Sequence, residues 1–315
     1  MAITDTRLVH GVIGFAIGDA LGLPVKGQTR AQLTEKPIDK MTGYGTFDQP
    51  AGNYSDETSL VIASMMGLTQ GFDLAAVKSA YQQWYTDSEY APYQGPVVDI
   101  WPATKNALTD QPLADTQNDP GGLTRVLPLA YFLFKEGHTD LVNDPQALTQ
   151  LSDFVSLTNP DKDNIIAGVI YAQAIINLLN GQTDLHVALR DSIASAAKYY
   201  TQNDATAWQN FARLTNPQFA ELPVADYRAA SDPVSILEAV IWSALNTDNY
   251  KDALLTAVNL GGNTDTLGAL VGGLAGLAYG YQSLPHKWCL VLAKYSEIVD
   301  LCRQAEASGY FPKYD

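Results

Sequence analysis

Two adjacent carboxylates, Asp56 and Glu57, follow Ser55 and precede a long apolar run in the segment GNYSDETSL. One interpretation is an ordinary helix start, because serine is a favoured N-cap and acidic residues in the first turn complement the helix dipole. The other is half of a metal site, because a hydroxyl and two carboxylates offer several oxygen atoms to Mg²⁺ or Mn²⁺. The two interpretations are compatible, since a capping serine can stand beside metal-binding carboxylates.

A second oxygen-rich run lies in LGGNTDTLGALVGG (residues 260–273). Gly261 and Gly262 permit an unusual backbone turn. The next four residues all carry oxygen-bearing side chains: Asn263, Thr264, Asp265 and Thr266. A helix cap needs one such residue or two, so the run indicates an oxygen-ligand cluster, with Thr266 expected to open the helix.

A third carboxylate, Asp19, lies in an apolar helical stretch that ends at GLPVKG. A buried aspartate is costly unless it is paired or hydrogen-bonded. Asp19 could bind metal, hold a helix end or cap a neighbouring turn, and the two structural roles are favoured. Other chemistries fit poorly: the four histidines are isolated, which argues against a His/Cys zinc site, and neither a P-loop nor a nucleophile elbow is present.

Helical periodicity dominates the segments that must position these residues. Apolar residues recur at spacings of three and four in eight stretches: 8–22, 58–68, 74–85, 125–137, 163–181, 234–246, 250–260 and 266–280. No stretch alternates with period two over a convincing length. The sequence therefore predicts an all-α fold, as one domain over 1–315, with long connections at 86–122 and 202–233.

Glycines recur every four residues in two of these helices. One row is Gly14, Gly18 and Gly22, and the other is Gly268, Gly272, Gly276 and Gly280. Each interior glycine costs about 1 kcal/mol relative to alanine, so the rows need a packing reason. We expect both stripes to face closely packed partners, and they could face each other.

Composition excludes several classes of function. Lys and Arg number 19 against 34 Asp and Glu, so 19 − 34 gives a net charge of −15. Such a surface repels nucleic acid and anionic membranes. The two cysteines form neither a disulfide framework nor a CxxC motif, and the N-terminal sequence lacks signal-peptide features. We expect a soluble, cytoplasmic protein without membrane spans.

Five segments, in order, resemble the motifs of the ADP-ribosylglycohydrolase family. They are IGFAIGDALGLPV (13–25), AGNYSDETSL (51–60), GGLTRVLPLAYFL (121–133), LTNPD with the following helix (157–181), and NLGGNTDTLGALVGGLAG (259–276). The resemblance covers nearly the whole chain. It implies an all-helical hydrolase that removes ADP-ribose from proteins or small conjugates with the help of two Mg²⁺ or Mn²⁺ ions.

The resemblance also implies roles for individual residues. The expected metal ligands are Ser55, Asp56, Glu57, Asn263, Asp265 and Thr266. The ions would polarise the ribose hydroxyls and position a water, Asp56 or Glu57 would accept its proton, and Asp265 would bridge the ions. The expected substrate-binding residues are Asp19, Lys26, Gly121, Gly122, Asn159, Gly261 and Gly262, with helix N-termini assisting at the diphosphate.

This chain departs from the family pattern at five positions. Glu57 and Asn263 stand where aspartates are usual, Lys26 where a glutamate is typical, Pro120 where asparagine is common, and Asn159 where histidine is usual. The Lys26 ammonium could replace one cation, leaving one ion of the two, or contact the diphosphate. Three hypotheses follow: an active hydrolase on arginine or another acceptor, a catalytically impaired ADP-ribose-binding module, or a structural protein that retains only the scaffold.

Overall fold

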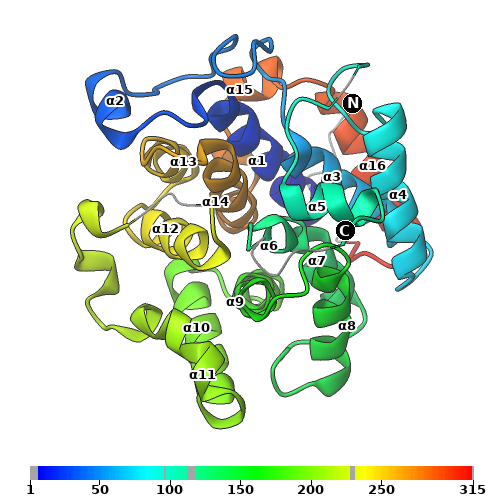
Figure 1. The fold of residues 1–315 in the computed structure, drawn as a ribbon, viewed down its shortest axis with the longest axis vertical. Helices are drawn as coiled ribbons and strands as arrows, with labels where there is room; N and C mark the ends of the chain where they lie inside the picture. Colours follow the sequence, from blue (N-terminus) through cyan, green and yellow to red (C-terminus); the bar gives the residue numbers. More distant parts are fainter. Residues whose placement is uncertain (1–5, 96, 113–117, 228–230, 314–315) are drawn as a thin grey trace.

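Two glycine-striped helices, α1 (Arg7–Gly22) and α14 (Thr264–Tyr279), pack against each other near the middle of the molecule (Figure 1). A methyl group added at Gly14 would lie 2.4 Å from the Gly272 carbonyl oxygen. One added at Gly18 would lie 1.9 Å from the Gly268 carbonyl oxygen. Only hydrogen fits at these positions, so the expected pairing of the two glycine rows is confirmed.

Gly280, the last glycine of the second row, has a different structural role. Gly280 follows the end of α14 with φ of +73°, a conformation that favours glycine, and a methyl group there would lie 3.8 Å from the His10 side chain of α1, which is an ordinary contact and not a close approach of two backbones. At the opposite end of the contact, a methyl group at Gly22 would lie 2.2 Å from the Thr264 carbonyl oxygen. The antiparallel contact therefore brings the C-terminus of α1 beside the N-terminus of α14.

The computed structural model describes residues 6–95, 97–112, 118–227 and 231–313. These ranges contain no β-strand, only an isolated bridge between Thr69 and Gly71, and the predicted all-α class is confirmed. Beyond α1 and α14, the α-helices are α2 (Arg30–Glu35), α3 (Asp56–Gly67), α4 (Leu74–Asp87), α5 (Pro102–Leu108), α6 (Gly121–Thr124), α7 (Val126–Lys135), α8 (Pro145–Ser156), α9 (Lys162–Leu179), α10 (Leu185–Asn203), α11 (Ala205–Trp208), α12 (Pro233–Leu245), α13 (Tyr250–Val258), α15 (His286–Val291) and α16 (Tyr295–Ala307).

All eight predicted helices are present, with ends shifted by a few residues. The two long connections hold more structure than predicted. The first contains α5 and α6, and the second contains α11 and three short 3-10 helices, η2 (Gln209–Thr215), η3 (Phe219–Glu221) and η4 (Val224–Asp226). Another 3-10 turn, η1 (Leu23–Val25), follows α1, and η5 (Tyr281–Ser283) follows α14.

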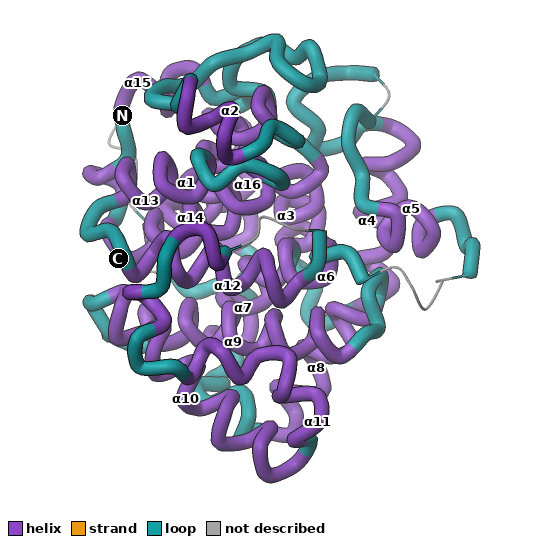
Figure 2. The backbone as a smooth tube through the Cα atoms, turned by 60° about the vertical axis from the view of Figure 1, so that its left-hand side comes forward, coloured by secondary structure: helices purple, strands orange, loops and turns teal. Residues whose placement is uncertain are grey.

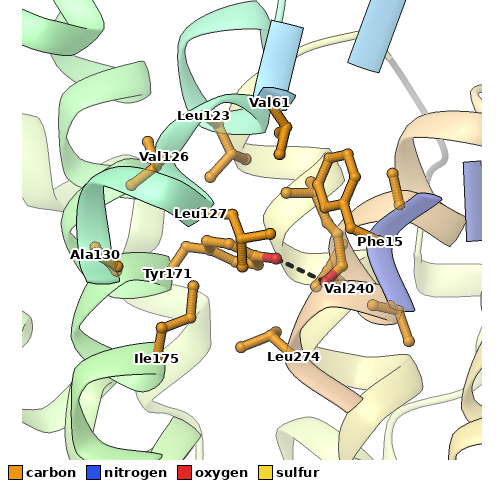
Figure 3. Packing of buried hydrophobic residues seen from close by; sticks show 14 of the residues in the cluster. Phe15, Val61, Leu123, Val126, Leu127, Ala130, Tyr171, Ile175, Val240 and Leu274 are labelled. Carbon is orange, nitrogen blue, oxygen red and sulfur yellow. Dashed lines mark hydrogen bonds between the residues drawn. The ribbon is translucent and has the colours of Figure 1, made fainter. Parts of the chain in front are cut away.

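The helices surround a continuous hydrophobic core, with α10 and α11 at one end of the molecule and α2 and α15 at the other (Figures 1 and 2). Figure 3 shows side chains from several helices meeting around Tyr171 of α9. Its hydroxyl donates a hydrogen bond of 2.8 Å to the carbonyl of Leu270 on α14, so this buried polar group is satisfied.

One helical segment, Arg7–Val25, is long and apolar enough to cross a membrane. It is entirely buried inside the fold, as the central helix of a globular protein must be.

Candidate active site

The N-terminus of α3 is held in place by Asp19 of α1. The fully buried Asp19 carboxylate accepts hydrogen bonds from the backbone N–H groups of Ser55 and Thr58, each at 3.0 Å, and from the Thr58 hydroxyl at 2.7 Å. Burial, followed by the nearby Asp265, raises the pKa of Asp19 to about 8. These bonds place Asp19 in a positioning role between two helices.

Ser55 caps α3, as one of the two initial interpretations predicted. Its Oγ accepts a hydrogen bond from the backbone N–H of Glu57 at 3.2 Å. The carboxylates of Asp56 and Glu57 follow in the first turn, and both side chains are buried. A simple cap would leave such carboxylates in water, so their burial favours a functional site in addition to the cap.

The second oxygen-rich run meets the first one across the core. Thr266 donates a hydrogen bond of 2.7 Å from its hydroxyl to Glu57 Oε1, and Asp265 lies buried beside it at the start of α14. The helix starts at Thr264, two residues before the predicted Thr266, because Thr264 Oγ1 is anchored at 2.7 Å to the carbonyl of Gly22. Asn263 stands at the N-cap position without a capping bond and donates to Ser231 Oγ at 3.2 Å.

Lys26 enters the same cluster from the loop after α1. Its Nζ lies 2.9 Å from Asp265 Oδ2 and also pairs with Asp99. Burial alone would lower the pKa of Lys26, but Asp265 and Asp99 outweigh it and raise the pKa well above its usual value. The ammonium is therefore a fixed positive charge among carboxylates.

Gly261 and Gly262 hold the Lys26 loop against α14. The Gly262 N–H donates to the Gln28 carbonyl at 2.8 Å, and the Gly27 N–H donates to the Gly262 carbonyl at 2.8 Å. A methyl group on Gly261 would lie 2.7 Å from the Gln28 carbonyl oxygen, and both glycines have positive φ. The predicted unusual turn is present, and it forms a two-sided backbone clamp.

Two further site residues, Asp99 and Trp101, were not found by the sequence analysis. Trp101 Nε1 donates to Glu57 Oε1 at 2.9 Å, and the Lys26 Nζ lies 4.9 Å from the centre of the indole ring. Burial and then Asp265 raise the pKa of Asp99 to about 7. Both residues lie in the irregular segment before α5, where periodicity gives no signal, although an acidic residue among apolar ones in VVDIWP could have indicated a buried site.

The cluster has more negative than positive charge. It holds five carboxyl groups, those of Asp19, Asp56, Glu57, Asp99 and Asp265, against the Lys26 ammonium, so full ionisation would give −5 + 1 = −4. Burial and the neighbouring Glu57 raise the pKa of Asp56 well above its usual value. Burial and Asp265 likewise raise the pKa of Glu57. Additional positive charge would therefore stabilise the ionised cluster.

Unpartnered oxygens indicate where that positive charge would bind. Both carboxylate oxygens of Asp56, Oε2 of Glu57 and Oδ1 of Asp265 are buried and have no hydrogen-bond partner. Carboxylate oxygens suit a hard divalent cation, so the donors fit the predicted Mg²⁺ or Mn²⁺. In the described part of the chain no three His, Cys, Asp or Glu side chains already lie together as a ligand set, so the carboxylates of Asp56, Glu57 and Asp265 would have to move toward a common point to hold one ion.

The remaining predicted residues belong to a neighbouring polar network around Arg125. Asn159 accepts from Arg125 Nη2 at 3.2 Å and donates to Asp119 Oδ1 at 2.9 Å, so it links these two charged residues. Gly121 and Gly122 are the first residues of α6 and follow Pro120 at the N-cap position. A methyl group on Gly121 would lie 2.9 Å from Thr104 Oγ1, and one on Gly122 would lie 2.8 Å from Val155 Cγ1. Asn159 and the two glycines therefore have packing and positioning contacts, and their expected role in substrate binding stays a prediction.

Comparison with known proteins decides the family. Residues 2–312 match the family model described as ADP-ribosylglycohydrolase. The chain belongs to the ADP-ribosylglycohydrolase family. It is 26% identical to the ADP-ribosylarginine hydrolase Tri1 of Serratia proteamaculans (strain 568), over 93% of this chain and 77% of that protein. It is 25% identical to the ADP-ribosyl-[dinitrogen reductase] glycohydrolase of Rhodospirillum rubrum, over 90% of this chain and 88% of that protein.

The fold of this ADP-ribosylglycohydrolase family member also matches a solved structure. An ADP-ribosylglycohydrolase-related protein complex superimposes with a TM-score of 0.75 and 25% identity, covering 96% of this chain and 98% of the other. The resemblance inferred from five sequence motifs is thus confirmed, and the chain is a member of a hydrolase family that acts on glycosyl bonds.

Proposed function

We propose that this protein hydrolyses the glycosidic bond between ADP-ribose and a modified protein side chain, with arginine as the first acceptor to test. The cluster of unpartnered buried oxygens on Asp56, Glu57 and Asp265 is the observation that carries the proposal. The acceptor is suggested by the relatives from Serratia proteamaculans and Pseudomonas putida (strain GB-1), both named ADP-ribosylarginine hydrolase.

The oxygen donors of Asp56, Glu57 and Asp265 would hold the divalent cation, with Ser55, Thr266 and Asn263 beside them. When bound, Mg²⁺ or Mn²⁺ supplies positive charge that polarises the oxygen atoms of the substrate. Thr266 orients Glu57 from α14, while Trp101 orients it from the segment before α5. The second Glu57 oxygen is thereby presented in a fixed direction.

Asp56 is the best candidate to accept the proton of the attacking water. Both of its oxygens lack a hydrogen-bond partner, whereas one oxygen of Glu57 already accepts two hydrogen bonds. General-base catalysis requires a carboxylate that is held in place and has a lone pair available. Asp56 meets that condition because its backbone lies in the first turn of a helix that Ser55 and Asp19 anchor.

A catalytically impaired ADP-ribose-binding module is the second candidate. It is favoured by the Lys26 ammonium, which lies among the carboxylates that would hold the cation. It also draws on the neutral amide of Asn263, which donates to Ser231. In this case the protein would retain affinity for ADP-ribose and release none from conjugates.

The test is to incubate the purified protein with ADP-ribosyl-arginine and ADP-ribosyl-serine peptides and to quantify free ADP-ribose. We expect release from the arginine peptide with Mg²⁺ or Mn²⁺ and none after chelation. The variant Asp56→Asn should lose at least about 100-fold in rate, the lower range of general acid–base contributions. The variant Asp153→Asn, which changes an exposed carboxylate on α8, should keep full activity. Binding of ADP-ribose without release from either peptide would instead support the binding module.

A further inference from the structure

Some carboxylate oxygens of the cluster contact a cation and others have no partner. Lys26 Nζ contacts one oxygen of Asp265 and pairs with Asp99. In contrast, both oxygens of Asp56, one of Glu57 and the second oxygen of Asp265 have no hydrogen-bond partner. Asp265 thus has one oxygen on the ammonium and one that faces no donor.

We propose that the Lys26 ammonium is a built-in cation of this site, so that the chain binds a single divalent ion rather than two. The ion would use the unpartnered oxygens of Glu57 and Asp265 and one oxygen of Asp56, which leaves the other Asp56 oxygen available as a base, while Asp265 would contact both the ion and the ammonium. This inference rests on the proposed function in taking the cluster as the catalytic centre. It deepens that function by assigning the number of metal ions and the role of Lys26.

The position of Lys26 is set by its backbone. Gly27 and Gln28, directly after it, are clamped to Gly262 by two hydrogen bonds of 2.8 Å. The Lys26 carbonyl accepts a hydrogen bond of 2.7 Å from Thr46 Oγ1. The side chain is 13% exposed and its ammonium lies over the Trp101 ring. The ammonium is therefore held among the carboxylates by its two ion pairs, by the indole ring and by the anchored backbone on either side of Lys26.

A fixed ammonium excludes a second divalent ion for two reasons. It engages oxygens of Asp99 and Asp265, which are then not available to such an ion. It also repels any cation placed in contact with it, and this repulsion is weakly screened in a buried site. Removing the ammonium while keeping an apolar stem should therefore create room and ligands for a second ion.

The experiment is calorimetric titration of the metal-free protein with Mn²⁺, in the absence of substrate. We expect one Mn²⁺ per chain for the wild type and two for Lys26→Met. Electron paramagnetic resonance should show isolated Mn²⁺ in the wild type and a spin-coupled pair in Lys26→Met. The matched control Lys78→Met, which removes a surface ammonium 3.0 Å from Asp110, should bind one ion like the wild type.

Two Mn²⁺ ions, or none, on the wild type would overturn the inference whatever the variants do, so it can be tested even if Lys26→Met fails to fold. A folded Lys26→Met with wild-type stoichiometry would also overturn it. Two ions together with chelator-sensitive hydrolysis would overturn this inference and leave the proposed hydrolase intact. One ion in the wild type without hydrolysis of any conjugate would support the single-ion site and count against the hydrolase.

Discussion

At the scale of single residues, Asp56 and Glu57 are neighbours in sequence that meet different surroundings. Glu57 Oε1 accepts from Trp101 and Thr266, so one end of its carboxylate is fixed. Asp56 has no such donor on either oxygen. The extra methylene of glutamate lets Glu57 reach donors from two other segments, while the shorter aspartate stays at the helix terminus. The glutamate at position 57, where the family motif suggests an aspartate, is therefore held in one orientation by two hydrogen bonds.

Replacing Trp101 with phenylalanine tests whether the orientation of Glu57 matters for catalysis. The variant keeps an aromatic ring in the side chain beside Lys26 and removes the Nε1–H donor to Glu57, together with part of the indole volume, a loss that the control variant shares. A hydrogen bond to a charged group contributes about 1.5–3 kcal/mol, so we expect kcat/KM to fall roughly 10- to 100-fold. The matched control is Trp242→Phe, because Trp242 Nε1 is buried and has no hydrogen-bond partner. Equal activity of Trp101→Phe and Trp242→Phe would contradict the orienting role.

Helical periodicity points to the site carboxylates at the starts of regular helices, whereas Lys26 and the Gly261–Gly262 turn lie between helices and were predicted from the motifs. The acidic and hydroxyl residues at the starts of α3 and α14 could be chosen because they precede periodic apolar runs. Asp99 and Trp101 lie in an irregular segment and reach the cluster only through tertiary contacts with Lys26 and Glu57. The segment VVDIWP could indicate that Asp99 is buried, but no local pattern shows which residues Asp99 and Trp101 contact.

At the scale of elements, the glycine rows predicted the close contact between α1 and α14. Glycine lowers helix stability, so a row of glycines is expected only where two helices pack closely. Helix α10, in contrast, was not predicted, because its sequence pattern is weak. It buries Leu185, Leu189 and Ile193 on one face, but alanines, serines and polar residues separate them and weaken the apolar pattern. Predicting the helices around the site was therefore easier than predicting those at the periphery, where amphipathic patterns are diluted.

Substituting Gly18 with alanine should disrupt the contact that joins the two halves of the site. The new methyl group would lie 1.9 Å from the Gly268 carbonyl oxygen, and backbone atoms cannot rotate away. We expect the free energy of unfolding to fall by about 3 kcal/mol or more, at or above the usual range for overpacking. Urea unfolding followed by circular dichroism measures this change.

The control for that substitution is Gly168→Ala in α9. There the added methyl group would meet side-chain methyl groups at 3.3 Å or more, and alanine favours helix by about 1 kcal/mol over glycine. We expect near-wild-type stability. If Gly18→Ala were as stable as Gly168→Ala, the close α1–α14 contact would not be what fixes Lys26 and Asp265 in place.

At the scale of the whole molecule, the negative charge of the site adds to that of the surface. A net charge of −15 makes the protein attract cations in general, so any effect of a metal must be separated from ionic screening. The site differs from the surface in being buried and in presenting carboxylate oxygens without partners. A divalent ion should therefore stabilise the protein at concentrations far below those at which salt acts.

Binding of Mn²⁺ should raise the melting temperature of the entire fold, because α1, α3 and α14 carry both the site and the centre of the core. At a free concentration 100 times Kd, one ion contributes about 2.7 kcal/mol, or roughly 5 °C for a chain of this size. Scanning fluorimetry with Mn²⁺ against NaCl of equal ionic strength measures the shift. The shift should vanish in Asp265→Asn, where the carboxylate proposed to contact both the ion and the Lys26 ammonium is neutralised. It should persist in Asp153→Asn, since that carboxylate lies on the exposed face of α8. An equal shift in both variants would assign the stabilisation to the acidic surface and not to the site.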